Sequence, residues 1–235
     1  MSFALAELEV FHSRSYSPTR RIALGRRELP LEPPPGFGPL LLGGIVAVGA
    51  DDLEPDDVEA LLMLMAQLEH GKRVVQPRIR NRFQTDQHGL GRTVGRLLGD
   101  GEQLEYDFEG NGSPLQMTLA SIYAAGQAPM MLRPRVFDVL RKGLRWRGPI
   151  DGALITHLSG RHGAPTSVAA YIDPNQWALD LLGLATADGG TSSKRDVQRR
   201  FRKLVRDAHP DHGAENEGAA QRIAELTEAR RILLG

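Results

Sequence analysis

The 235 residues of the chain are 41% hydrophobic and 25% charged, a composition typical of a soluble globular protein with room for one large or two small domains. The 29 basic and 29 acidic residues give a formal net charge of zero, so no overall field attracts the chain to nucleic acid or anionic lipid. The absence of cysteine excludes disulfides, thiol catalysis and Cys-ligated zinc sites.

The beginning of the chain lacks the basic start and apolar core of a secretory signal. The longest apolar stretch, residues 39–50, contains Gly43 and Gly44 and is too short to span a bilayer. We therefore expect a cytoplasmic protein without a membrane partner.

The first 165 residues carry signals for both strands and helices. Short apolar runs predict strands at 8–11, 22–24 and 29–31, and three prolines within 32–38 predict a stiff connection. Pro55, followed by two acidic residues suited to the positive end of the helix dipole, predicts a helix over 55–70 that Gly71 closes. Alternating residues predict a strand within 101–110, and helices are expected at 114–125 and 134–142. These elements predict an α+β domain over residues 1–165, with the boundary at 160–167.

The last part of the chain predicts three helices, in a domain over residues 168–235. Asp173 as N-cap, Pro174 at the first helical position and Gln176 open a short helix that ends at Gly183. Ser193 and Asp196 fit a capping box for a second helix. That helix is amphipathic: Val197, Phe201, Leu204, Val205 and Ala208 share one face, and Arg195, Arg199, Arg202, Lys203 and Arg206 share the other.

The tripeptide His209-Pro210-Asp211 follows the basic helix directly. Pro210 ends that helix because it lacks the N–H and pushes His209 toward extended geometry. Residues 212–218 are expected to form a loop. A third helix follows, with Glu225 and Glu228 outside; its apolar face contains Ala219, Ile223, Leu226, Leu233 and Leu234.

This order of short helix, basic helix, His-Pro-Asp and apolar helix resembles the J-domain of the DnaJ family of co-chaperones. The resemblance covers residues 173–235 and includes Leu181-Leu182-Gly183-Leu184, Phe201-Arg202-Lys203-Leu204, Leu226-Thr227-Glu228-Ala229 and Ile232-Leu233. The chain departs from the family at Ala178 and Leu179 in place of paired tyrosines, at Ala208 in place of an aromatic residue, and at Gln198, Arg200 and Arg230. The loop 185–192 is also longer than is usual in the family.

The resemblance implies that the C-terminal domain binds a DnaK-type heat-shock chaperone and stimulates its ATPase, so that the chaperone locks onto a client protein. The implied partner-binding residues are His209, Pro210, Asp211, Phe201, Arg202, Lys203, Arg195, Arg199 and Arg206. A basic helix face suits an acidic docking surface, because opposed charges speed encounter and orient the partners. No catalytic residue and no cofactor are implied, because the hydrolytic site belongs to the partner. Without cysteine pairs or a long Gly/Phe-rich segment, the chain is similar to specialised family members with their own N-terminal domain.

Other residue clusters in the N-terminal region suggest weaker hypotheses. Seven basic residues, Lys72, Arg73, Arg78, Arg80, Arg82, Arg92 and Arg96, can hold phosphates, but we favour a solvated surface because Phe83 alone offers base stacking. His157, His162 and Asp151 can ligate a metal, but unpaired surface histidines are far commoner, so we expect none. The glycines at 89, 91 and 95 are not followed by the Gly-Lys-Ser/Thr sequence that ends a Walker loop, so we expect a turn there. Ser159 does not lie in the Gly-x-Ser-x-Gly sequence of a hydrolase nucleophile.

Two classes of function follow. In the first, the chain is an adaptor whose N-terminal domain binds a client or complex and whose J-domain recruits the chaperone there. In the second, the chain binds nucleic acid or is an enzyme, and its J-domain is secondary or degenerate. The intact His209-Pro210-Asp211 favours the first class. The second class would be favoured if the chain bound nucleic acid with a steep salt dependence and lost this binding when Arg78, Arg80 and Arg82 were neutralised. We expect the first, with no enzymatic activity of the chain itself.

Overall fold

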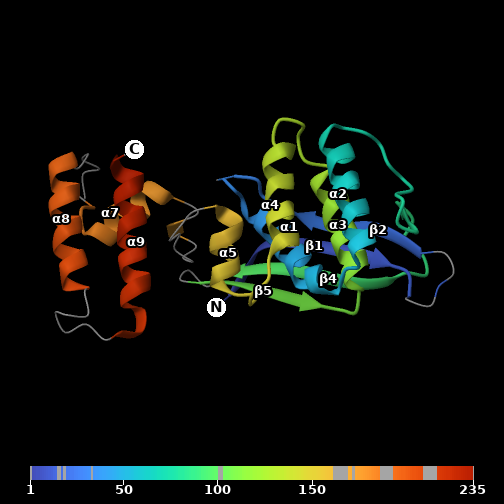
Figure 1. Cartoon of the computed structure of the whole chain (residues 1–235), viewed down its shortest axis with the longest axis horizontal. Coiled ribbons are helices and arrows are strands. Elements are labelled where there is room, and N and C mark those ends of the chain that lie inside the picture. The colour runs from blue at the N-terminus through green and yellow to red at the C-terminus, as the bar shows by residue number, and fades with distance from the viewer. Residues whose placement is uncertain are drawn as a thin grey trace. The chain divides into compact units, whose positions relative to one another are not determined.

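The structure is a computed structural model that describes residues 2–14, 17, 20–32, 34–99, 103–160, 169–170, 173–185, 193–208 and 216–234, with side chains of the last segment from 222 onward. The chain divides into two compact units: Met1–Asp100 with Leu104–Ser159, and Gly101–Gln103 with Gly160–Gly235. It is an α+β protein, with a five-stranded mixed sheet in the first unit and helices in both units (Figure 1).

The sheet of the first unit has the strand order β3-β2-β1-β4-β5. Its strands are β1 (Phe3–His12), β2 (Arg20–Glu28), β3 (Asn81–Gln84), β4 (Gly91–Gly99) and β5 (Leu104–Glu109). Only β2 and β3 are parallel; β1 pairs antiparallel with both β2 and β4, and β4 with β5. Along β1, buried Ala6, Leu8 and Val10 alternate with Glu7 and Glu9, so the sheet has one apolar and one charged face.

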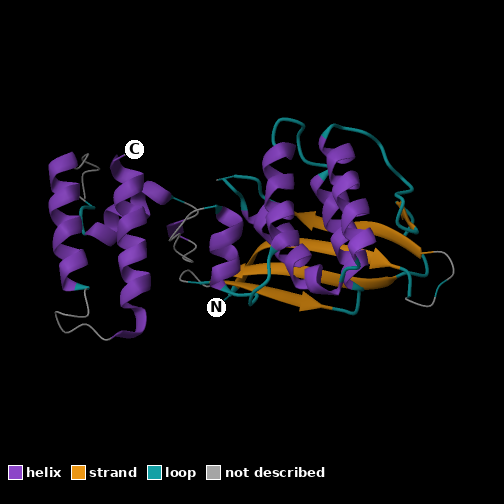
Figure 2. Cartoon of the chain, in the orientation of Figure 1, coloured by secondary structure: helices purple, strands orange, loops and turns teal. Residues whose placement is uncertain are grey.

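Helices cover the apolar face of this sheet (Figure 2). They are α1 (Phe37–Gly49), α2 (Pro55–Glu69), α3 (Pro114–Ala125), α4 (Arg133–Arg145) and α5 (Gly152–Ser159), with a short 3₁₀ turn at Ala50–Asp52. α1 is apolar on all sides and buried at every position except Val48, as expected of a helix packed between a sheet and other helices. None of the helices in the described ranges combines the length and apolar character that a membrane crossing requires.

Two glycines set the contact between α1 and α4. A Cβ atom on Gly143 of α4 would overlap the carbonyl oxygen of Gly43 on α1. Around Gly43 the side chains of Val139 and Leu158 close the remaining space, at 2.9 and 3.1 Å from the position of a Cβ. The two backbones therefore approach more closely than any other residue type would allow.

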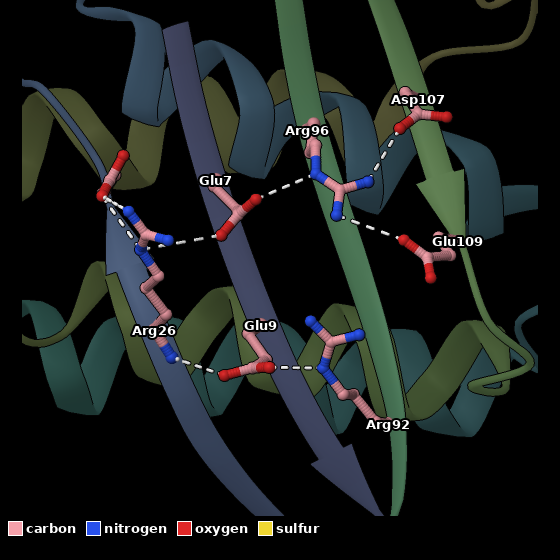
Figure 3. A network of polar contacts seen from close by, with 8 residues as sticks. Glu7, Glu9, Arg26, Arg92, Arg96, Asp107 and Glu109 are labelled. Atoms are coloured by element: carbon pink, nitrogen blue, oxygen red, sulfur yellow. Dashed lines mark hydrogen bonds and ion pairs between the residues drawn. The ribbon is translucent and has the colours of Figure 1, made fainter. Parts of the chain in front are cut away.

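The face of the sheet opposite the helices carries a network of ion pairs across β2, β1, β4 and β5 (Figure 3). Arg96 is its centre and donates to Glu7 at 2.9 Å, Asp107 at 3.0 Å and Glu109 at 3.1 Å. Glu9 accepts from the backbone N–H of Arg26 at 2.9 Å and from the Arg92 side chain. The hydrogen bond from Arg26 and the Arg92 guanidinium together lower the pKa of Glu9, although partial burial opposes them. Opposite charges on neighbouring strands thus stabilise the sheet on the face opposite these helices.

Most predicted elements of the first unit are confirmed, and several were missed. The strands at 8–11, 22–24 and within 101–110 lie in β1, β2 and β5, and the predicted helices correspond to α2, α3 and α4. α1, α5, β3 and β4 were not predicted, and Gly91 and Gly95 lie in β4 rather than in a turn. The strand expected at 29–31 is wrong: Pro30 has no N–H for a sheet, and its carbonyl accepts from Gly38 at 2.8 Å.

The described part of the second unit is helical. α7 (Pro174–Leu182), α8 (Lys194–Asp207) and α9 (Asn216–Leu234) confirm the three predicted helices, although α9 begins inside the predicted loop 212–218. α8 and α9 run antiparallel side by side, and both contact α7 (Figure 1). Their buried core contains Ala170, Trp177, Ala178, Leu182, Val197, Leu226 and Ala229.

We predict that Gly143→Ala destabilises the first unit by roughly 2 to 4 kcal/mol, because the added methyl group forces α4 away from α1. Helix propensity alone would stabilise this substitution by about 1 kcal/mol, so the sign of the change tests the close contact. Urea unfolding measures it. Arg145→Ala, at an exposed position of the same helix, should change the free energy of unfolding by less than about 0.5 kcal/mol. A stabilised Gly143→Ala protein would contradict the prediction.

Glu9→Gln should lower the free energy of unfolding at pH 7 by about 1 to 2 kcal/mol, because a charge-assisted acceptor is lost. Since the pKa of Glu9 is lowered in the folded state, its contribution is present above the unfolded-state pKa and is lost as the pH falls through the folded-state value. The difference between wild type and variant should therefore shrink in acid. Urea titrations from pH 7 to pH 3 measure this difference in the free energy of unfolding. The control is Glu105→Gln at an exposed position of β5, which should differ little from wild type at pH 7 or at pH 3.

Candidate partner-binding surface

The short helix α7 is fixed at both ends by local hydrogen bonds. The Asp173 carboxylate accepts from the backbone N–H of Gln176 at 2.9 Å and caps the start. At the other end Gly183 is left-handed, with φ of 62°, and donates to the Asp180 carbonyl, while Leu184 donates to the Leu179 carbonyl. These two bonds form a Schellman motif, which returns Leu184 to the core.

The basic helix α8 begins at a similar cap. The Ser193 hydroxyl accepts from the backbone N–H of Asp196 at 3.2 Å and donates to its carboxylate at 2.6 Å. Val197 is buried, and Phe201, Leu204, Val205 and Ala208 pack against the core, as the amphipathic pattern predicts. The helix ends at Asp207, with Ala208 as its C-cap.

The opposite face of α8, which we call the basic face, consists of Arg195, Arg199, Arg202, Lys203 and Arg206, and all five are exposed. Arg199 pairs with Asp196 at 3.1 Å, but its side chain is 82% exposed, so the pair contributes little to stability. Arg202 donates to the backbone carbonyl of Gln198 at 3.3 Å. Among the described residues, no carboxylate pairs with Arg195, Arg202, Lys203 or Arg206. Most of the positive charge on this face is therefore uncompensated within those ranges.

Two arginines that are absent from the basic face hold the helices together. Arg200 donates from Nε to the Leu182 carbonyl at 3.0 Å, which joins α8 to the end of α7. Arg230 of α9 lies 5.0 Å above the ring of Phe201 on α8, a cation–π contact between antiparallel neighbours. The positions of the five exposed basic residues thus depend on a framework of polar as well as apolar contacts.

Glu228 was predicted on the outer, solvent-facing side of the third helix, and this prediction is wrong. Glu228 is 3% exposed, and Arg231 binds both of its carboxylate oxygens at 2.7 Å. This hydrogen bonding raises the pKa of Arg231. The bidentate partner explains how a carboxylate is tolerated at a buried position. The hydrophobic periodicity of the sequence did not indicate that Glu228 is buried. Glu228 and its partner Arg231 are both charged and lie one turn apart on the same helix.

The structure brings together part of the predicted partner-binding set. The five residues of the basic face share one surface of α8, whereas Phe201 lies half-buried against the core under Arg230. The tripeptide His209, Pro210 and Asp211 lies outside the described residues, directly after α8 in sequence. Gln198 is exposed near the start of the basic face and adds no charge to it.

Six residues of the basic cluster of the first unit are divided among three places, and the seventh, Arg80, is exposed and belongs to none of them. Arg92 and Arg96 belong to the ion-pair network of the sheet, and Arg78 lines a hollow with Asp56, Asp57 and Glu59. Lys72, Arg73 and Arg82 line a separate cavity. The ring of His157 lies 5.0 Å from Trp146, His162 lies outside the described residues, and no cluster suited to a metal ion occurs within the described ranges.

No protein-family model, curated protein or solved structure matches the chain. The arrangement of the second unit is therefore interpreted from its own residues. An exposed row of cations on a capped helix, held rigidly by two neighbouring helices, can bind an acidic surface of a macromolecular partner. Such a surface is suited to recognition of a partner.

We predict that Arg200→Ala lowers the stability of the second unit by about 1 kcal/mol, because the Leu182 carbonyl loses its side-chain donor. Trp177 is buried in this unit, so its fluorescence in a Trp146→Phe background follows unfolding of this unit alone. Arg199→Ala removes the same charge from an 82% exposed position and should change stability by less than about 0.5 kcal/mol. Equal effects of the two substitutions would refute the positioning role of Arg200.

Proposed function

We propose that this chain is a cytoplasmic J-domain co-chaperone. In this proposal the second unit stimulates the ATPase of a DnaK-type heat-shock chaperone, and the first unit binds the client or complex to which the chaperone is recruited. The observation that carries the proposal is the exposed, largely uncompensated basic face of α8, which ends directly before His209-Pro210-Asp211.

The architecture of the second unit supports this proposal. A short helix ending in Leu-Gly, a basic helix and an apolar helix follow one another in the order expected of a J-domain, and α8 and α9 are antiparallel around a common core. The apolar residues of α8 point into that core, so its cations are left for a partner. The contacts among the three helices add to the resemblance in sequence, which itself includes their order.

Charge gives the basic face its physical role. α8 contains seven basic and two acidic residues, a net of five positive charges, in a chain whose formal net charge is zero. Such a local concentration of charge acts over roughly 8 to 10 Å at physiological ionic strength, so it orients an acidic partner only at close approach. It increases the rate of association more than the final affinity. His209 and Asp211 would then provide hydrogen-bonding groups that act after docking.

Two departures from the J-domain pattern have structural explanations. Arg200, at a position where alanine is common, binds the Leu182 carbonyl, and Arg230, where tyrosine is common, covers Phe201. Each makes a polar contact within the helical framework. Ala208 and Gln198 instead remove an aromatic ring and a charge near the proposed docking face. We therefore expect a J-domain with a stable framework and a modest strength of partner binding.

The full-length chain should raise the single-turnover ATPase rate of its cognate DnaK-type chaperone, and His209→Gln should abolish this stimulation. The substitution leaves the described helices unchanged in sequence, so circular dichroism should not differ from wild type. The measurement is release of phosphate from a preformed chaperone–ATP complex. If wild type and variant stimulate equally, or if wild type does not stimulate, the proposal is wrong.

Neutralising Arg202→Gln and Lys203→Gln together should reduce stimulation by about tenfold at low salt, and less as salt rises, because screening already weakens the wild-type attraction. The matched control is the double variant Arg78→Gln and Arg80→Gln, which removes two positive charges from the first unit. It should stimulate like wild type at every salt concentration. Equal loss in both variants would indicate that net charge, and not the basic face, drives the interaction.

A further inference from the structure

A cavity of about 460 Å³ lies in the first unit. Its walls come from the end of α2, the following segment 71–75, β3 and the end of α3, with Arg133 from the start of α4. Small-molecule sites in proteins commonly have volumes of about 300 to 1,000 Å³. The cavity therefore has the size for a metabolite and is too small for a folded partner.

The charges that line this cavity are all positive. Lys72, Arg73, Arg82 and Arg133 contribute to the lining, and no aspartate or glutamate does. Arg133 is already engaged, because it donates to the carbonyls of Leu68 at 3.0 Å and Ala128 at 2.9 Å. Lys72, Arg73 and Arg82 pair with no carboxylate among the described residues. Three cations with no counter-charge at one cavity are suited to an anion of more than one charge.

Aromatic residues form another part of the wall. Phe83 and Tyr123 stack with ring centroids 4.0 Å apart and an interplanar angle of 8°. Phe83 is half-buried, whereas Tyr123 is only 4% exposed. The Tyr123 hydroxyl is buried and has no hydrogen-bond partner within the described structure. Burial raises the pKa of Tyr123 to about 12.

We propose that this cavity binds a mononucleotide. Lys72, Arg73 and Arg82 hold the phosphate groups, and the base lies against the aromatic wall that Phe83 forms with Tyr123. Phosphate oxygens favour arginine and lysine donors, and a planar base gains free energy by stacking on an aromatic ring. Gln84 and Gln127 line the same space, but the Gln84 amide donates to the Asp86 carbonyl and the Gln127 amide oxygen accepts from Arg27.

The hollow around Arg78 differs from the larger cavity in the charges that line it, and it is therefore a poor site for an anion. It is smaller, about 280 Å³, and Asp56, Asp57 and Glu59 line it together with Arg78. Three carboxylates repel an anion, so Arg78 has its counter-charges already. Arg78 and Arg80 lie in the same segment as Arg82 but do not line the larger cavity. They provide a control with equal charge and a different location.

The test is isothermal titration of the full-length chain with ATP and AMP, and with ribose 5-phosphate, inorganic phosphate and a single-stranded oligonucleotide as comparison probes. We expect saturable binding of one nucleotide per chain, with ribose 5-phosphate and inorganic phosphate at least about tenfold weaker because they lack the base. Arg73→Gln with Arg82→Gln should weaken nucleotide binding by at least about tenfold. Arg78→Gln with Arg80→Gln should change it less than about twofold, since the net charge is the same and only the location differs.

Tyr123→Phe separates binding from folding. It keeps the ring stack and removes a hydroxyl that has no partner in the free protein, so the melting temperature without nucleotide should be unchanged or higher. The rise in melting temperature that nucleotide causes should be smaller than in wild type. A variant that is destabilised without nucleotide and responds to nucleotide like wild type would contradict a role for this hydroxyl in the site.

Three outcomes would overturn the proposal. The first is no saturable binding of either nucleotide at concentrations up to about 1 mM, already weak for a specific site. The second is equal loss of binding in the two double-arginine variants. The third is binding of inorganic phosphate or of the oligonucleotide as tightly as the nucleotide, which would indicate a general anion site or a nucleic-acid surface. None of these measurements involves the chaperone, so their result is independent of the co-chaperone proposal.

Discussion

The close approach of α1 to α4 is the constraint on which the first unit depends. α1 is apolar on every side, so it has to be covered by the sheet below and by helices around it, and Gly43 and Gly143 allow α4 to come near enough to do this. Once α4 is in place, Arg133 at its start reaches the Leu68 carbonyl at the end of α2. A backbone contact in the core thereby determines the shape of a cavity at the edge of the helical layer.

The formal net charge of the chain is zero, but its cations and carboxylates are distributed unevenly over the surface. On the face of the sheet opposite the helices, Arg92 and Arg96 pair with carboxylates on the neighbouring strands. On α8, and around Lys72, Arg73 and Arg82, the cations lack such partners within the described ranges. Some arginines of this chain therefore link neighbouring strands, and others have donors available for a ligand or partner. Only the spatial neighbours of an arginine decide which of these two roles it has.

Local signals in the sequence were sufficient for the capped helices. Ser113, Asp173 and Ser193 each accept from a backbone N–H three residues later, as their spacing predicts. β4 could not be predicted, because its two arginines and its glycines are explained only by residues distant in sequence: Gly95 leaves room for Ile45, and Arg96 pairs with Glu7. The same holds for the candidate sites. The basic face of α8 follows from periodicity, whereas the selection of Lys72, Arg73 and Arg82 from seven basic residues follows from tertiary packing.

The way in which α7 ends has a consequence for how this chain can evolve. Leu184 is anchored in the core after the Schellman motif, and Ser193 anchors the start of α8, so the segment between them joins two fixed points. The entropy needed to close a segment grows only with the logarithm of its length, about 0.6 kcal/mol for each doubling. Insertions there would therefore cost little, because each neighbouring helix end is fixed by its own hydrogen bonds. A lineage can lengthen this connection while α8 keeps its contacts with α7 and α9.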